Sequence, residues 1–213
     1  MMYMTQFHLN ARRAGARKLL GSPQVMHAAL MSGFPPGVGA GRVLWRIDDD
    51  ADPLRPAVFV VSSEPIDVAH IEEQGGWPSQ PTTRQVGYDS FLRDLAVGQV
   101  WAFRLRANPT HRANVLGKKR VLAHVTASQQ LQWLLARAPE MGCEFGTAEA
   151  PTVAVTNREV VRFRRDGASV TLGVARFDGA LTVTDPERLR VALTQGVGRA
   201  KAYGCGLLTL AQP

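Results

Sequence analysis

A single turn signal fixes how the segment from residue 158 to residue 174 can fold. The segment reads REVVRFRRDGASVTLGV, with Asp166 and Gly167 between two runs rich in β-branched residues. Asp-Gly is a favoured two-residue turn of a β-hairpin. This turn sets a register in which Phe163 faces Val170, so one face of the hairpin is apolar.

The opposite face of this hairpin carries a row of arginines. Arg158, Arg162 and Arg164 share it opposite small residues, and Arg165 follows them. Positions along a strand are spaced by ~3.3 Å per residue, which is commensurate with consecutive phosphates. The row is either a solvated face that keeps an exposed sheet soluble or a contact surface for RNA. Solvated faces usually mix charges, and Glu159 is the only acid among these strand positions, so we favour RNA contact.

The predicted elements follow the same order in both halves of the chain. In the first half, strands are expected at 2–9, 42–47, 57–62 and 100–107, and helices at 23–32 (capped by Ser22) and near 66–73. In the second half, strands are expected at 120–125, 153–165, 169–184 and 207–210, and helices at 128–137 and at 186–194, the latter capped by Asp185. Two βαββαβ halves predict an α+β protein with tandem ferredoxin-like domains, the architecture of RNA-recognition motifs.

The predicted domains are an N-terminal ferredoxin-like domain at 1–108, a linker at 109–118 and a C-terminal ferredoxin-like domain at 119–213. Residues 1–97 hold 9 Lys and Arg against 10 Asp and Glu, whereas residues 98–213 hold 16 against 8. A neutral half joined to a basic half favours a polyanionic partner, and nucleic acid in particular.

The chain has two cysteines, Cys143 and Cys205, and neither a CxxC motif nor a Cys/His cluster. This usage favours the reducing cytoplasm and argues against disulfides or structural zinc. The longest apolar runs are far shorter than a membrane span, and the opening residues alternate as in a strand rather than a signal peptide. We therefore expect a cytoplasmic protein without a membrane partner.

The C-terminal segment at 195–213, QGVGRAKAYGCGLLTLAQP, is rich in glycine. Arg199 and Lys201 lie among four glycines, namely Gly196, Gly198, Gly204 and Gly206. Glycines permit positive φ, so successive N–H groups can form a nest for a phosphate beside these two cations. The glycines follow a predicted helix and precede a strand, the reverse of a dinucleotide fingerprint, and no cofactor is expected. A connection chosen for tight helix–strand packing remains the alternative.

His27 lies on the helix predicted at 23–32, and Gln24 shares its face three residues earlier. An imidazole can accept a proton from a ribose 2′-hydroxyl or donate one to a leaving 5′-oxygen near neutral pH. The alternative is an ordinary histidine on a helix surface.

The only dense acidic run, residues 48–52, lacks the glycine and the closing Glu of a calcium loop, so it is interpreted as a solvated loop. Metal-dependent cleavage needs clustered carboxylates. We therefore expect chemistry without a metal.

The strand at 100–107 alternates strongly. Trp101, Phe103 and Leu105 share one face, and Arg104 and Arg106 share the other. The aromatic side chains could stack on bases, but such alternation more often indicates a core, which is the interpretation that we favour.

Six motifs together make the chain similar to a known family along nearly its whole length. They are YMTQFHLN at 3–10, the helix with His27, FRLRANP at 103–109, QWLLAR at 132–137, FDGALTVTDPERL at 177–189, and the glycine-rich C-terminal segment. The chain resembles the CRISPR repeat-processing endoribonuclease of the type I-E Cascade complex.

The resemblance implies an enzyme that binds the hairpin of the CRISPR repeat RNA and cuts at its 3′ base without metal. The 2′-hydroxyl attacks the adjacent phosphate and leaves a 2′,3′-cyclic phosphate and a 5′-hydroxyl. The enzyme, monomeric when free, then keeps the crRNA as a subunit among the other Cascade proteins. The resemblance makes His27 the catalytic histidine, the arginine-bearing hairpin the RNA-groove element, and the segment at 196–206 the glycine-rich loop.

One position departs from the family pattern, which commonly has Tyr where this chain has Gln24. Gln can orient a hydroxyl or phosphate oxygen but has no useful proton to donate. A subunit that binds the RNA hairpin without cutting it is therefore the alternative function. A third possibility is a general single-strand binder that uses Trp101 and Phe103.

Overall fold

Two antiparallel sheets organise the computed structural model, which describes residues 1–35, 37, 41–77, 79–115, 117–147, 149–165 and 167–213. The first sheet has the order β2-β3-β1-β4 and consists of β1 (Tyr3–His8), β2 (Leu44–Asp48), β3 (Ala57–Ser62) and β4 (Arg84–Gly87). The second has the order β11-β5-β10-β8, with β9 also paired to β10, and consists of β5 (Val100–Ala107), β8 (Cys143–Glu144), β9 (Val153–Arg165), β10 (Ala168–Val183) and β11 (Leu208–Ala211). A separate hairpin consists of β6 (Thr110–Val115) and β7 (Lys118–Ala123).

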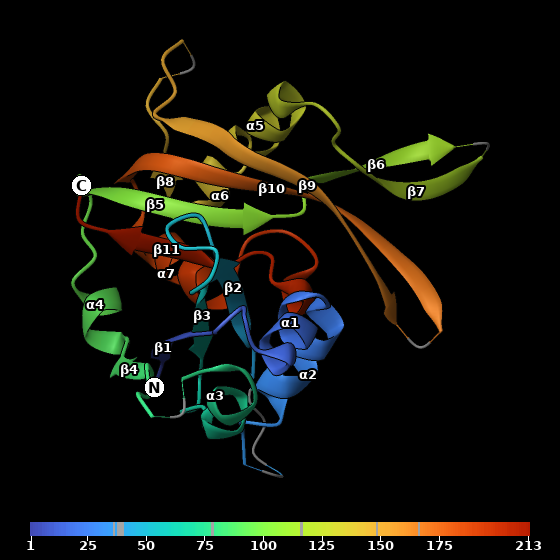
Figure 1. Ribbon diagram of the computed structural model, residues 1–213. Coiled ribbons are helices and arrows are strands. Elements are labelled where there is room, and N and C mark those ends of the chain that lie inside the picture. Colours follow the sequence, from blue (N-terminus) through green and yellow to red (C-terminus); the bar gives the residue numbers. More distant parts are fainter. Residues whose placement is uncertain (36, 38–40, 78, 116, 148, 166) are drawn as a thin grey trace.

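The helices lie around these sheets (Figure 1). Those of the first half are α1 (Ala14–Leu20), α2 (Pro23–Met31), α3 (Ala69–Gly75) and α4 (Asp89–Arg93). Those of the second half are α5 (Ala127–Leu135), α6 (Ala138–Met141), α7 (Pro186–Gln195) and the 3₁₀ turn η1 (Lys201–Tyr203). The Asp185 side chain accepts hydrogen bonds from the first turn of α7, which confirms the predicted cap.

The first sheet has its first and third strands, β1 and β3, in the centre. The second sheet has β5 and β10 in the centre, which are its first and third long strands when the two-residue strand β8 is set aside. Both orders are those of a ferredoxin-like fold, so the predicted fold class is confirmed. The placement of β5 in the first half was wrong. The fourth strand of the first sheet is β4, which lies within residues 64–96, where no strand was predicted, and β5 pairs with β10 and β11. Alternation identifies a strand but not its partner, which is set by contacts distant in the sequence. Of the segment predicted as a linker, residues 110–115 form β6, and Lys118 begins β7.

A core between the first sheet and its helices holds α2 in place. Phe7 and Leu9 are fully buried against Met26 and Leu30 of α2. Burying each such side chain contributes about 1.5–3 kcal/mol. The buried face fixes the orientation of α2. Gln24 and His27, on the same helix, are half-buried.

A second core connects the two sheets. Leu44 and Val61 of the first sheet belong to the same buried cluster as Phe103 and Leu105 of β5, and Trp101 packs against it. The prediction that this aromatic face is core is confirmed. Neither Trp101 nor Phe103 is therefore a free stacking platform for bases.

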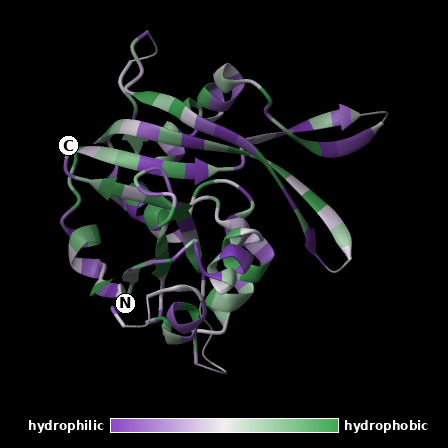
Figure 2. Ribbon diagram, viewed as in Figure 1, coloured by the Kyte–Doolittle hydropathy of each residue, from purple (hydrophilic) through white to green (hydrophobic). Residues whose placement is uncertain are grey.

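The β9–β10 hairpin has the predicted register. Phe163 lies opposite Val170, and Arg162 lies opposite Thr171. Hydrophobic and hydrophilic residues alternate along both strands (Figure 2). Asp166 of the predicted turn lies outside the described residues, and Gly167 has a φ of 80°. The hairpin projects from the body on the same side as β6–β7 (Figure 1).

Candidate nucleic-acid interface

The helix that carries His27 begins at a well-defined cap. The Ser22 side chain accepts a hydrogen bond from the Val25 N–H at 3.5 Å, and Pro23 occupies the first turn, as predicted. Gln24 and His27 are three residues apart and therefore neighbours on the helix surface.

Burial lowers the pKa of His27 below its ordinary value of 6.5. Its Nδ1 has no hydrogen-bond partner among the described residues. The imidazole is therefore neutral at pH 7, and a neutral imidazole has one nitrogen ready to accept a proton.

The glycine-rich loop adopts the backbone predicted for it. Gly196, Gly198, Gly204 and Gly206 all have positive φ, with values of 74°, 78°, 73° and 89°. The loop is also tightly packed: a Cβ on Gly204 would lie 2.8 Å from the Trp45 ring, and one on Gly198 would lie 3.0 Å from the Trp133 ring. These contacts agree with the packing alternative, and an anion-binding role for the loop remains a proposal.

The two cations of this loop differ in their surroundings. Lys201 is half-buried, and its Nζ donates a hydrogen bond to the Gln195 carbonyl at 2.6 Å. Burial and then the charge of Arg42 lower the pKa of Lys201. Arg199 is exposed and lines a groove beside α5.

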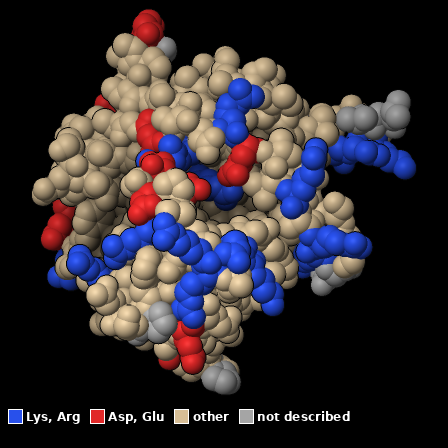
Figure 3. Space-filling model, viewed as in Figure 1, with Lys and Arg blue, Asp and Glu red and all other residues tan. Residues whose placement is uncertain are grey.

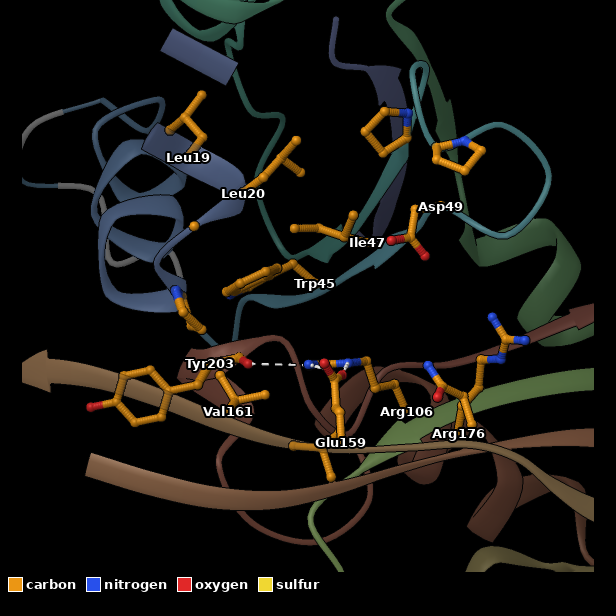
Figure 4. A pocket seen from close by; sticks show the side chains of 16 residues that line it. Leu19, Leu20, Trp45, Ile47, Asp49, Arg106, Glu159, Val161, Arg176 and Tyr203 are labelled. Carbon is orange, nitrogen blue, oxygen red and sulfur yellow. Dashed lines mark hydrogen bonds and ion pairs between the residues drawn. The ribbon is translucent and has the colours of Figure 1, made fainter. Parts of the chain in front are cut away.

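The start of α2, η1 and β9 meet at a cleft between the two sheets (Figure 4). This cavity of about 260 Å³ is lined by Pro23 before Gln24, by Trp45, by Val161 of β9 and by Tyr203 of η1. Gln24 and His27 lie on the same helix but do not line the cavity. The structure thus brings the His27 helix beside the segment with Lys201 and beside the arginine hairpin.

Three of the four hairpin arginines share one face, as the register requires. Arg162 and Arg164 are exposed, and Arg164 donates to the Gly167 carbonyl at 3.0 Å. Arg158 donates to the Val125 carbonyl. Arg165 lies on the opposite face, where its Nη1 contacts the Tyr203 hydroxyl at 3.0 Å. Lys and Arg side chains are prominent around both hairpins, and at the cleft they lie among Asp and Glu side chains (Figure 3).

Residues 49–52 of the acidic run form the exposed loop that was predicted, but Asp48 ends β2 and two of the carboxylates are paired with arginines. Asp48 pairs with Arg46 at 2.8 Å, and Asp50 pairs with Arg104 of β5 at 2.8 Å. The hydrogen bonds from Arg104 hold the pKa of Asp50 below its ordinary value. Sequence inspection missed this network because its partners are far apart in the chain.

Within the described residues, no cluster of three or more His, Cys, Asp or Glu side chains is arranged to hold a metal ion. The same part of the chain contains no helix that is long and apolar enough to cross a membrane.

The protein has tandem ferredoxin-like domains. The two sheets share one buried core, and the second sheet carries the basic β9–β10 hairpin. The family described as "CRISPR associated protein" matches residues 2–212. The chain belongs to this family.

Relatives and solved structures agree with this assignment. The CRISPR-associated endoribonuclease Cse3 of Thermus thermophilus is 31% identical over 221 residues, which cover 99% of this chain and 100% of the relative. The CRISPR system Cascade subunit CasE of Escherichia coli is 30% identical over 140 residues, or 61% of this chain and 64% of the relative. Thermus thermophilus Cse3 bound to an RNA representing a pre-cleavage complex has a TM-score of 0.82 at 29% identity, with coverage of 99% and 98%.

Proposed function

We propose that this protein is an endoribonuclease that binds the hairpin of the CRISPR repeat RNA and cuts at its 3′ base. One observation carries the proposal: helix α2 with His27 contacts both η1 with Lys201 and β9 with the arginines. The chain also aligns over 99% of its length with a relative named as an endoribonuclease. The product stays bound, and the protein, monomeric until then, serves as a Cascade subunit in the cytoplasm.

The proposed reaction needs only proton transfer and charge stabilisation. The ribose 2′-hydroxyl loses its proton, its oxygen attacks the adjacent phosphorus, and the bond from phosphorus to the 5′-oxygen breaks. The products are a 2′,3′-cyclic phosphate and a 5′-oxygen that takes up a proton. His27 is neutral at pH 7 and is suited to accept the first proton, a role that contributes ~10²–10⁴-fold in rate.

The remaining acceleration comes from position and charge. Gln24 carries an amide that can hold a hydroxyl or phosphate oxygen in line. Lys201 lies on the turn packed against α2, and in this proposal its ammonium stabilises the charged phosphorane. The glycine loop with Arg199, together with Arg158, Arg162 and Arg164 on one face of the hairpin, holds the RNA backbone. Arg165, on the opposite face beside Tyr203, contributes less.

The proposal is tested with purified protein, its cognate repeat RNA and excess chelator. A matched RNA carries a 2′-deoxy substitution at the scissile nucleotide. We expect cleavage of the first RNA only, with a cyclic phosphate on the 5′ product. Cleavage of the deoxy RNA, or activity only after metal is added, would contradict the mechanism.

A second function, hairpin binding without cleavage, is favoured by two observations. Gln24 stands where the resemblance would place Tyr, and the Lys201 ammonium is already bonded to the Gln195 carbonyl. Tight hairpin binding with both RNAs left intact in the same experiment would establish this alternative.

A further inference from the structure

A groove that the proposed reaction does not use lies between the β6–β7 hairpin, α5 and the glycine loop. Its volume of about 760 Å³ is in the range typical of ligand sites. The lining includes His111 and Arg112 of β6, His124 after β7, and Trp133 of α5. Arg199 closes the groove from the glycine loop.

The charge of this groove favours an anion. Arg112, Arg137 and Arg199 line it, and none of the described lining residues is Asp or Glu. Arg112 and Arg199 are exposed, so their guanidinium groups are accessible to a ligand. Guanidinium groups bind phosphate with two parallel hydrogen bonds when the geometry allows.

The groove also presents flat rings. The imidazoles of His111 and His124 lie with centroids 4.6 Å apart and planes 38° apart. The Arg137 guanidinium lies over the Trp133 ring, 4.1 Å from its centroid. Burial, then the charges of His111 and Arg137, lower the pKa of His124, so this ring is neutral at pH 7. Neutral aromatic rings and guanidinium planes are the surfaces on which single-stranded bases stack.

We propose that this groove binds single-stranded RNA that flanks the repeat hairpin. A base of the flank stacks on the exposed His111 ring, and its phosphates pair with Arg112 and Arg199. Gly198 and Arg199 line the groove and belong to the glycine loop, so the flank is continuous with RNA held at that loop. The inference rests on the proposed function, because there the loop contacts the hairpin.

The test measures RNA affinity by fluorescence anisotropy with the full chain. Three RNAs are compared: the hairpin alone, the hairpin with five nucleotides added on its 5′ side, and the hairpin with five nucleotides added on its 3′ side. All three carry a 2′-deoxy substitution at the scissile nucleotide, so that they are not cut. We expect one flank to tighten binding about tenfold, which corresponds to about 1.4 kcal/mol. An abasic version of that flank separates stacking from phosphate contacts.

The variants target exposed lining residues, so the fold is retained. His111→Ala should remove the gain that depends on bases, and His111→Phe should keep it. Arg112→Ala should weaken binding of the abasic flank too and lower the salt slope by ~0.7. Arg93→Ala, which removes an exposed arginine on α4, is the control and should leave the gain unchanged.

Two results would overturn the groove proposal. One is a flank that adds no affinity on either side, which would leave the groove to a protein segment. The other is a gain that survives in both His111→Ala and Arg112→Ala. If the hairpin alone does not bind, the proposed function fails, and the flank is then measured as a free oligonucleotide. Binding that depends on His111 and Arg112 would still support the groove, and its absence would refute it.

Discussion

Arg46 of β2 donates a hydrogen bond to the main-chain carbonyl of Arg104 on β5 at 3.0 Å. The same guanidinium is only 2% exposed, pairs with Asp48 at 2.8 Å and donates to the Leu207 carbonyl at 3.2 Å. A buried cation of the first sheet is therefore bonded to two main-chain oxygens of the second domain, one on β5 and one just before β11. This arrangement fixes the two ferredoxin-like domains on either side of the cleft.

Arg46→Ala should strongly destabilise the protein. The substitution removes the paired hydrogen bonds from Arg46 to the Asp48 carboxylate, which is 13% exposed and keeps only Arg104 at 3.4 Å, and it removes a donor from two carbonyls. Breaking a buried pair in this way costs about 3–5 kcal/mol. Urea unfolding checks the value, with Arg93→Ala as a control expected within about 0.5 kcal/mol of the parent. Equal stability of the two variants would show that Arg46 does not hold the domains together.

The sequence predicts those features that depend on neighbouring residues. The Asp-Gly turn gives the β9–β10 register, confirmed at Phe163 and Val170, and Asp185 gives the start of α7. The partner of β5 and the pair between Asp50 and Arg104 could not be predicted, because both join segments far apart in the chain.

Helix α1 was missed. It has no side-chain cap to mark its start and is held by tertiary packing of Ala16 and Leu19. The candidate residues divide in the same way: His27, Lys201 and the arginines can be proposed from motifs and spacing and remain predictions, whereas the contact between His111 and His124 is visible only in the fold.

Gly204→Ala should destabilise the protein more than Gly98→Ala. Both glycines have positive φ, 73° and 86°, so both substitutions carry similar backbone strain of about 1–2 kcal/mol. Only at Gly204 would the new Cβ meet a ring, 2.8 Å away in Trp45, and such overpacking costs about 1–3 kcal/mol more. Thermal unfolding of the two variants measures the difference. Equal losses would mean that the Trp45 ring moves aside freely.

Arg162→Ala and Arg164→Ala should each weaken binding of the repeat hairpin. Both side chains are exposed on one face of β9. Each lost phosphate contact should lower the slope of log affinity against log salt by ~0.7–0.9. Arg165→Ala tests the geometry, since this side chain contacts Tyr203 on the opposite face and should change the slope less. An unchanged slope in Arg162→Ala and Arg164→Ala would place the RNA elsewhere.

The free energy of unfolding should decrease as the pH falls from 7.5 to 5.5. Burial is the main cause that lowers the pKa of His8, His27 and His124 below 6.5. In this range the unfolded chain binds protons that the folded protein does not, so stability rises with pH and is lost below 6.5. Urea unfolding at both pH values measures the change. A double variant, His27→Gln with His124→Gln, should show a smaller pH dependence, and an identical one would contradict the assignment.

His27→Ala should abolish cleavage while leaving hairpin affinity nearly unchanged. Loss of one acid–base group lowers the single-turnover rate by ~10²–10⁴-fold. Because burial lowers the pKa of His27, kcat/KM should rise with pH through that lowered value and level off by pH 6.5. The rising limb should disappear in His27→Ala and persist in Gln24→Ala, whose amide orients oxygen but carries no proton. His8→Ala is the control, because this histidine on β1 lines a separate pocket with Arg55 and Trp77. A His27→Ala protein that cuts at the parental rate would exclude this residue as the base.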